Sequence, residues 1–68
     1  MYIVIELQTN ADGAVSNLVT AFDTLAEAES RYHSILASAA ISQIPVHSAI
    51  IVSAEGFPVQ HQCYKHAV

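Results

Sequence analysis

The chain has 68 residues, of which 53% are hydrophobic and only 12% are charged, and its net charge is −4. This composition excludes an intrinsically disordered chain, because disorder requires low hydrophobicity together with high net charge. Arg31 and Lys65 are the only permanent cations. A nucleic-acid-binding surface needs several cations to replace phosphate counterions, so we expect no direct nucleic-acid partner. The length predicts a single domain over residues 1–68.

Several features indicate a cytoplasmic protein. Cys63 is the only cysteine, so no internal disulfide can form and a reducing compartment is expected. The chain opens on the strand-like stretch MYIVIEL without a basic segment, and we therefore expect no signal peptide. No apolar run approaches the roughly 20 residues of a membrane helix, so a membrane partner is not expected.

The first hairpin is predicted over residues 2–8 and 14–22, and in its first strand Ile3, Ile5 and Leu7 recur on one face at the period of a strand. The stretch from Asn10 to Gly13 predicts a type I turn with a glycine bulge, which pairs Asn10 with Ala14 and places Tyr2 opposite Phe22. Residues 14–22 are apolar on both faces of the strand, which indicates burial on both.

The only long helical pattern covers residues 24–39. Thr24 followed by Glu27 has the form of a capping box, in which each side chain binds a free backbone N–H of the first turn. Spacings of three and four residues predict one buried stripe, formed by Leu25, Ala28, Tyr32, Ile35, Leu36 and Ala39. We expect ion pairs on the exposed side between Glu27 and Arg31 and between Glu29 and a charged His33.

A second hairpin is predicted over residues 46–54 and 59–66, with Gly56 at the first central position of a type II′ turn. That turn pairs Ile50 with Cys63 and His47 with His66. The last strand contains polar residues and is preceded by Pro58, features that are typical of a sheet edge.

The element order predicts an α+β fold of the form β-β-α-β-β. Because the helix crosses back, the third strand runs antiparallel to the first and can pair beside it. We expect a four-stranded antiparallel sheet in the order 2-1-3-4, with one helix packed on one face. A single helix leaves the other face uncovered, and small chains often bury such a face in an oligomer.

We expect the uncovered face to be apolar and aromatic, and to contain the interface or binding residues. The predicted members are Tyr2, Val4, Leu18, Phe22, Ala49, Ile51 and Tyr64. Glu6 shares this face and is interpreted either as a solvated strand residue or as a contact to a partner's cation. Tyrosines are typical anchors of protein interfaces. We therefore expect a homo-oligomer, most simply a dimer, or contact with a host protein or small ligand.

No catalytic motif, cofactor site or metal-ligand spacing stands out. The remote metal candidates are His47, His61, Cys63 and His66, but a metal site needs three or four converging ligands. Cys63 shares a strand face with His61, yet no third residue that could orient such a pair is evident. We interpret Cys63 as a small buried thiol and expect the protein not to be an enzyme.

Two resemblances suggest functions. The stretch MYIVIELQTNADG, followed by NLVTAFDTLAEAES, resembles the start of HicB-type antitoxins, with a strand, an Asp-Gly turn, a second strand and a T-x-x-E-A helix. This resemblance implies an antitoxin that neutralises a basic toxin. Through IELQTNADG, ESRYH and VHSA, the whole chain is similar to short proteins encoded by gut bacteria and their phages. That similarity implies a compact accessory protein that inhibits or sequesters something in the host.

The sequence therefore predicts a small non-enzymatic binding module, a homo-oligomeric phage or mobile-element accessory protein that acts on a host protein or small ligand. A HicB-like antitoxin is the alternative, and a small metal-binding protein is the remote one.

Overall fold

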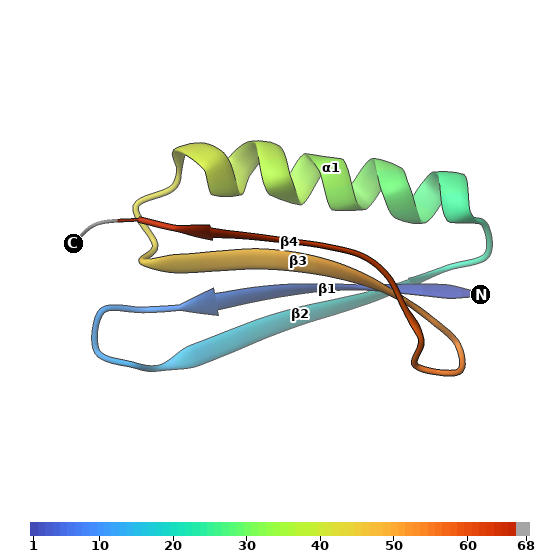
Figure 1. Ribbon diagram of the computed structural model, residues 1–68, viewed down its shortest axis with the longest axis horizontal. Coiled ribbons are helices and arrows are strands. Elements are labelled where there is room, and N and C mark those ends of the chain that lie inside the picture. Colours follow the sequence, from blue (N-terminus) through green and yellow to red (C-terminus); the bar gives the residue numbers. More distant parts are fainter. Residues whose placement is uncertain (67–68) are drawn as a thin grey trace.

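The computed structural model describes residues 1–66 and contains one sheet and one helix (Figure 1). The elements are β1 (Tyr2–Thr9), β2 (Val15–Phe22), α1 (Leu25–Ile41), β3 (Val46–Ser53) and β4 (Pro58–Lys65). All neighbouring strands are antiparallel, in the order β2-β1-β3-β4. The β-β-α-β-β fold and the strand order predicted from the sequence are confirmed. No helix within residues 1–66 has the length and apolarity needed to cross a membrane.

The first hairpin has the predicted register. Tyr2 pairs with Phe22 at one end and Thr9 pairs with Val15 at the other. In the turn, the Asn10 N–H donates to the Ala14 carbonyl at 2.9 Å, and the Gly13 N–H donates to the Asn10 carbonyl at 2.9 Å. Gly13 has a φ of 89°, which a residue with a Cβ adopts only with strain. The turn is therefore a type I turn closed by a glycine bulge.

The second hairpin has the same kind of turn, so the predicted type II′ turn is wrong. The Gly56 N–H donates to the Ser53 carbonyl at 2.8 Å, and the Ser53 N–H donates to the Phe57 carbonyl at 2.8 Å. Gly56 is thus the last residue of the turn rather than its first central residue. Both turn types place a glycine at positive φ, so the glycine alone could not distinguish them. The Ser53 hydroxyl also accepts from the Phe57 N–H at 3.1 Å and supports the observed turn.

The change of turn shifts the pairing next to the turn by three residues, and the register slip between Ile51 and Val52 reduces the shift to two along the rest of β3 and β4. Ile50 pairs with His61 and not with Cys63, which lies opposite Ser48. His47 pairs with Tyr64 and not with His66. Because the shift is even, each side chain still lies on the face predicted for it relative to β3.

The helix begins at the predicted cap. The Thr24 hydroxyl accepts from the Glu27 N–H at 3.2 Å and donates to the Glu27 carboxylate at 3.0 Å. The carboxylate therefore bonds the Thr24 hydroxyl and not the expected backbone N–H. The expected pairs along the helix are also replaced by contacts to the sheet. Arg31 lies 3.6 Å from Glu6, and Glu29 accepts from Gln60 at 2.9 Å.

The core lies between the helix and the face of the sheet that carries Val4. The predicted helix stripe is buried here through Ala28, Tyr32, Ile35 and Ala39, with Leu25 and Leu36 partly buried. The sheet contributes Val4, Ala49 and Ile51, with Tyr2 and Phe22 packed at the margin. The prediction that this face is uncovered is therefore wrong. Apolar residues occupy both faces of β1 and β3, so alternation alone could not determine which face the helix covers.

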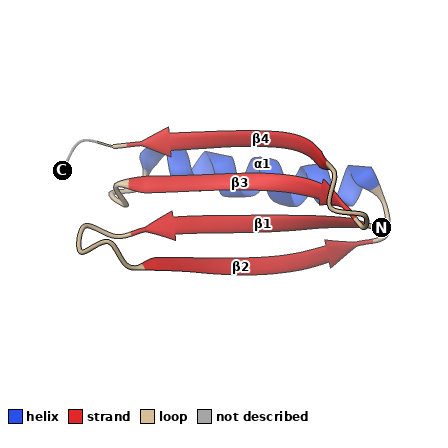
Figure 2. Cartoon of the chain, turned by 60° about the horizontal axis from the view of Figure 1, so that its bottom comes forward, coloured by secondary structure: helices blue, strands red, loops and turns tan. Residues whose placement is uncertain are grey.

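The opposite side of the sheet has no helix, and Figure 2 shows the strands from this side with α1 behind them. We call it the helix-free face. Its apolar members include Ile3, Ile5, Leu7, Val15, Val19, Ala21, Val46, Ile50 and Val52. An uncovered apolar face was expected, but it consists of aliphatic side chains, because the tyrosines and Phe22 of β1, β2 and β4 lie on the helix side.

Candidate functional site

Most residues predicted to form an interface lie beneath the helix. Val4 is 1% exposed and Ile51 is 0% exposed, so neither can touch a partner. Tyr2, Phe22 and Tyr64 are only partly exposed. Leu18 differs from them, because it lies on the edge strand β2 and is largely exposed. The helix covers these residues because its stripe needs an apolar surface, and Val4, Ala49 and Ile51 supply one.

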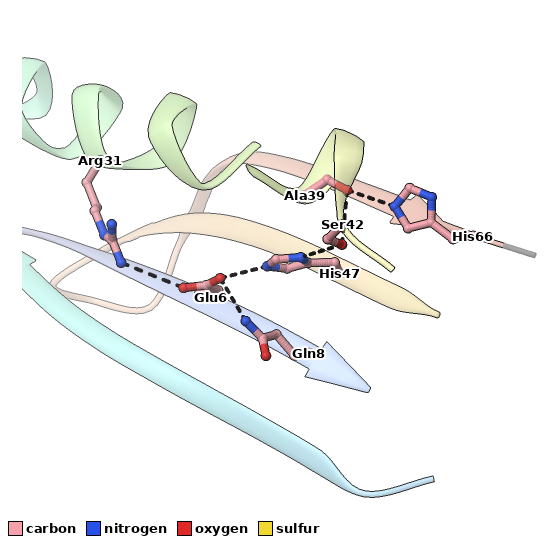
Figure 3. Close-up of polar contacts among 7 residues, drawn as sticks. All are labelled: Glu6, Gln8, Arg31, Ala39, Ser42, His47 and His66. Carbon is pink, nitrogen blue, oxygen red and sulfur yellow. Dashed lines mark hydrogen bonds and ion pairs between the residues drawn. The ribbon is translucent and has the colours of Figure 1, made fainter. Parts of the chain in front are cut away.

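Glu6 is the centre of a polar cluster that the helix brings together (Figure 3). Its carboxylate lies 2.6 Å from His47 Nε2 and 3.6 Å from the Arg31 guanidinium. The Gln8 side-chain amide donates to it at 3.0 Å. On the far side of the imidazole, His47 Nδ1 lies 3.1 Å from the Ser42 hydroxyl. We call these five residues the Glu6 cluster.

Three elements contribute to the Glu6 cluster. Gln8 of β1 pairs with His47 of β3 in the sheet, which places the imidazole beside the β1 side chains that point to the helix. Arg31 reaches down from the middle of α1. Ser42 is the C-cap of α1, and both its N–H and its hydroxyl lie 3.3 Å from the Ala39 carbonyl.

A second histidine lies at the same helix end. His66 Nε2 lies 2.7 Å from the Ala39 carbonyl, and its ring stacks on Tyr64 with centroids 6.3 Å apart. The last carbonyls of a helix carry a partial negative charge and have no partner within the helix. Ser42 and His66 therefore satisfy an acceptor that would otherwise lack a donor.

The electrostatics of the Glu6 cluster favour an ionised Glu6. Burial raises the pKa of the Glu6 carboxyl, but hydrogen bonds from His47 and Gln8, together with the charges of His47 and Arg31, outweigh that effect. The net result is a pKa below the ordinary value. A carboxylate that accepts several hydrogen bonds beside cations is stabilised in its charged form.

The cluster can be satisfied with either protonation state of His47. If the imidazole is neutral and donates from Nε2 to Glu6, the Ser42 hydroxyl donates to Nδ1. If it is an imidazolium, Nδ1 donates to the Ser42 hydroxyl, which then donates to the Ala39 carbonyl. Within residues 1–66, no buried side-chain nitrogen or oxygen lacks a hydrogen-bond partner. The network is therefore complete without a ligand.

A carboxylate, an imidazole and a hydroxyl in sequence also occur in hydrolytic triads. Here the imidazole is only 3% exposed, which leaves a reactant no path to it. The order of nitrogens is also reversed, with the carboxylate at Nε2 and the hydroxyl at Nδ1. This geometry suits a contact that fixes the end of α1 on the sheet. A nucleophile requires access as well as a base.

The metal candidates lie on two sides of the sheet. His61 and Cys63 lie on the helix-free face, while His47 lies beneath the helix beside its partner Tyr64. His66 follows β4 and contacts the end of α1. In the described part of the chain, no three His, Cys, Asp or Glu side chains are grouped so that they could hold a metal ion. Cys63 is partly exposed, not buried as expected.

Two hollows lie on the helix side of β2. The first has a volume of about 170 Å³ and is lined by Glu6, Gln8, Ser16, Asn17 and Leu18. The second has a volume of about 400 Å³, lies between α1 and β2, and is lined by Phe22, Glu27, Ser30, Arg31 and Ser34. The hollows form because the helix packs mainly on β3 and β1 and leaves β2 less covered.

Sequence reasoning identified Glu6 as unusual but did not find its partners. A cation for Glu6 was expected from another protein, whereas Arg31 and His47 supply it within the chain. One signal was present in the sequence. Glu6 and His47 both occupy positions on the face of Val4 and Ile51, and buried charged groups usually pair. Assigning that face to the helix would have brought them together.

Comparison with known proteins gives no match, since no protein-family model, no curated protein and no solved structure is significantly similar to the chain.

Proposed function

We propose that the protein is a small non-enzymatic binding module that acts as a homo-oligomer and holds a host protein on its helix-free face. The observation that carries this proposal is the aliphatic surface formed by β1, β2 and β3 opposite the helix. Contiguous apolar surfaces of this kind in soluble proteins usually contact a partner. This function corresponds to an accessory protein of a phage or mobile element that sequesters or inhibits its target.

The size of the helix-free face fits a protein partner. Strands of 8 residues are about 26 Å long and four of them are about 19 Å wide, so the face covers roughly 500 Å². Contact with a partner of equal area would bury roughly 1,000 Å² in total, which is near the lower limit of specific interfaces. Such a face is much larger than a small ligand requires.

The position of the polar groups supports the same proposal. The ionisable groups of the Glu6 cluster are engaged with one another beneath the helix. On the helix-free face, Lys65 and His61 lie on the outer strand β4 and rim the aliphatic centre. An apolar centre with a polar rim is the usual anatomy of a protein interface. The single thiol of Cys63 fits a reducing cytoplasm.

The test is native mass spectrometry of the protein isolated from its host, in three forms. The wild type should retain a stoichiometric protein partner. Ile5→Lys places a charge in the centre of the helix-free face and should release the partner. Ile41→Lys makes the same change at the end of α1, where Ile41 is 86% exposed, and should keep it. Thermal unfolding of each variant shows whether the fold is retained.

Retention of the same partner by Ile5→Lys, with its fold intact, would overturn the proposal, and so would the absence of any partner from the wild type. Loss of the partner from Ile41→Lys as well as Ile5→Lys would show that the helix-free face is not the binding surface.

An antitoxin-like function is favoured by one observation. Asp12, Asp23, Glu27 and Glu55 are all exposed, whereas Arg31 is partly buried against Glu6. Such an acidic surface would attract a basic toxin. Salt distinguishes the two functions, because binding to a basic partner weakens as salt screens the charges, whereas apolar contact does not.

A further inference from the structure

The edge strand β2 lacks the features that usually protect a sheet edge. Its 8 residues, VSNLVTAF, contain no charge, no proline and no glycine. Val15, Leu18 and Val19 are 63%, 54% and 56% exposed. Exposed edges that are long and apolar pair with other strands unless something prevents it. β2 carries apolar residues on each face, but it is mostly exposed and not buried on both faces as expected, and one of its sides has no neighbouring strand (Figure 2).

The other edge is protected in several ways. β4 begins at Pro58, which has no N–H to donate, and ends at Lys65. Its register also slips between Ile51 and Val52 of β3, which disturbs the regular ladder. Prolines, lysines and bulges are the usual means of blocking edge pairing. The two edges of one sheet therefore differ, and only β2 is open.

The hydrogen-bond pattern shows which backbone groups of β2 are free. The Asn10 N–H donates to the Ala14 carbonyl, so Ala14 directs its backbone groups toward β1. In an antiparallel ladder this direction alternates from residue to residue. The residues that direct their N–H and C=O away from β1 are therefore Val15, Asn17, Val19 and Ala21.

We propose that β2 pairs antiparallel with β2 of a second copy, about a two-fold axis at Leu18, to form one continuous sheet. This register pairs residues 15–21 of the two copies through the outward-directed residues, with Asn17 opposite the partner subunit's Val19 and Val15 opposite the partner subunit's Ala21. On the helix side, Leu18 meets the partner subunit's Leu18, and Ser16 meets the partner subunit's Thr20.

A second copy fits this edge better than a strand of a different protein for two reasons. The pairs are self-complementary, with apolar contacts at the axis and a hydroxyl pair on each side of it, and such cross-strand pairs stabilise a sheet. The net charge of −4 also opposes association of two copies. β2 carries none of that charge, so the copies can meet there without placing like charges opposite each other.

The partner copy also adds to the first hollow on the helix side. Ser16 and Leu18 line that hollow beside Glu6. In the proposed register the partner subunit's Leu18 and the partner subunit's Thr20 lie across from them and extend its wall. Two symmetric hollows, each beside one Glu6 cluster, would then flank the axis, and the two helix-free faces would form one larger surface.

The inference rests on the homo-oligomer part of the proposed function and specifies where the copies join. The first experiment replaces Leu18 with Lys or with Glu and measures mass in solution by light scattering. Each variant alone should be monomeric, with the dissociation constant raised at least about tenfold by like charges at the axis. An equimolar mixture of the two should recover the dimer. A monomeric wild type at its highest soluble concentration would overturn the proposal.

The second experiment tests the register by crosslinking in a Cys63→Ala background. Leu18→Cys places two thiols opposite each other at the axis and should give a disulfide-linked dimer on mild oxidation. Val15→Cys is equally accessible but lies opposite the partner subunit's Ala21, so it should remain unlinked. Crosslinking of Val15→Cys as fast as Leu18→Cys contradicts the register.

These results can be separated from the proposed function. A dimer that persists in the Leu18→Lys variant shows that the copies join elsewhere, which overturns this inference but leaves the homo-oligomer intact. Ile5→Lys, in contrast, leaves the outward backbone groups of β2 unchanged. It should release the host protein and keep the β2-linked dimer.

Discussion

At the scale of single residues, the Glu6 cluster shows how one carboxylate links three elements. Glu6 lies in β1, and its contacts reach His47 in β3 and Arg31 in α1. Each buried side-chain nitrogen and oxygen within residues 1–66 has a hydrogen-bond partner, which is the condition under which a polar group can be buried without a large cost. The cluster therefore fixes the position of α1 on the sheet, in addition to the apolar stripe beneath the helix.

Glu6 should make stability depend on pH in the acidic range. Its folded pKa lies below the ordinary value of 4.5, so its stabilising contribution is complete above that value. The contribution is lost as the pH falls through the ordinary pKa toward the folded one, because the unfolded chain then binds the proton more readily. Chemical denaturation of wild type and Glu6→Gln at several pH values measures this. The stability difference between them should shrink as the pH falls.

A matched control removes the same charge at an exposed turn, through Glu55→Gln. If Glu6→Gln and wild type kept a constant stability difference throughout the acidic range, Glu6 would not be stabilised by its neighbours as the structure indicates.

At the scale of elements, the two hairpins close with the same turn although their sequences differ. Asn10–Gly13 and Ser53–Gly56 are each followed by a residue, Ala14 or Phe57, whose carbonyl accepts from the N–H of the first residue of the turn. Gly13 and Gly56 have φ values of 89° and 86°. A Cβ added at either glycine would meet no atom within 4 Å, so backbone conformation alone makes glycine necessary.

Gly56→Ala should lower the free energy of unfolding by about 1–2 kcal/mol, because positive φ is unfavourable for residues with a Cβ. Gly13→Ala should cost a similar amount, since the two turns are alike. Gly56→Asn is the control and should cost less, because asparagine tolerates positive φ. Urea denaturation measures the free energy of unfolding of all three variants. An unchanged free energy of unfolding in Gly56→Ala would contradict the observed turn.

At the scale of the whole molecule, the single helix covers one face of the sheet and leaves the other face exposed, and the two faces differ in composition. The covered face holds the tyrosines, Phe22 and the Glu6 cluster, and the other face holds aliphatic residues. β1 and β3, at the centre of the sheet, are apolar on both faces, as is typical of strands buried on both sides. The helix covers only one of these two apolar faces. The exposed aliphatic face and the open β2 edge therefore both indicate association with another chain.

Ile50 and Ile51 give a direct test of which face the helix covers. Ile51 is 0% exposed beneath α1, so Ile51→Ala should lower the free energy of unfolding by about 2–5 kcal/mol. Ile50 lies on the helix-free face and is partly exposed, so Ile50→Ala should cost less. Denaturation at low protein concentration measures both variants. A larger loss for Ile50→Ala would indicate that the helix packs on the opposite face.

The sequence by itself determined the element order, the strand order, the first hairpin and the helix with its cap. These features depend on local patterns, namely period-two alternation, spacings of three and four, and turn residues between Asn10 and Gly13. The helix stripe from Leu25 to Ala39 was likewise set locally.

Only the tertiary structure decided which face the helix covers, the register of β4 and the partners of Glu6. The physical reason is that β1 and β3 are apolar on both sides, so their side-chain pattern is compatible with a helix on either face of the sheet. Gly56 likewise suits two turns, and the strand pairings that these turns impose differ by three residues. Arg31 contacts Glu6 only because α1 packs on the sheet face that carries Glu6 and His47. That packing depends on contacts between residues far apart in the chain.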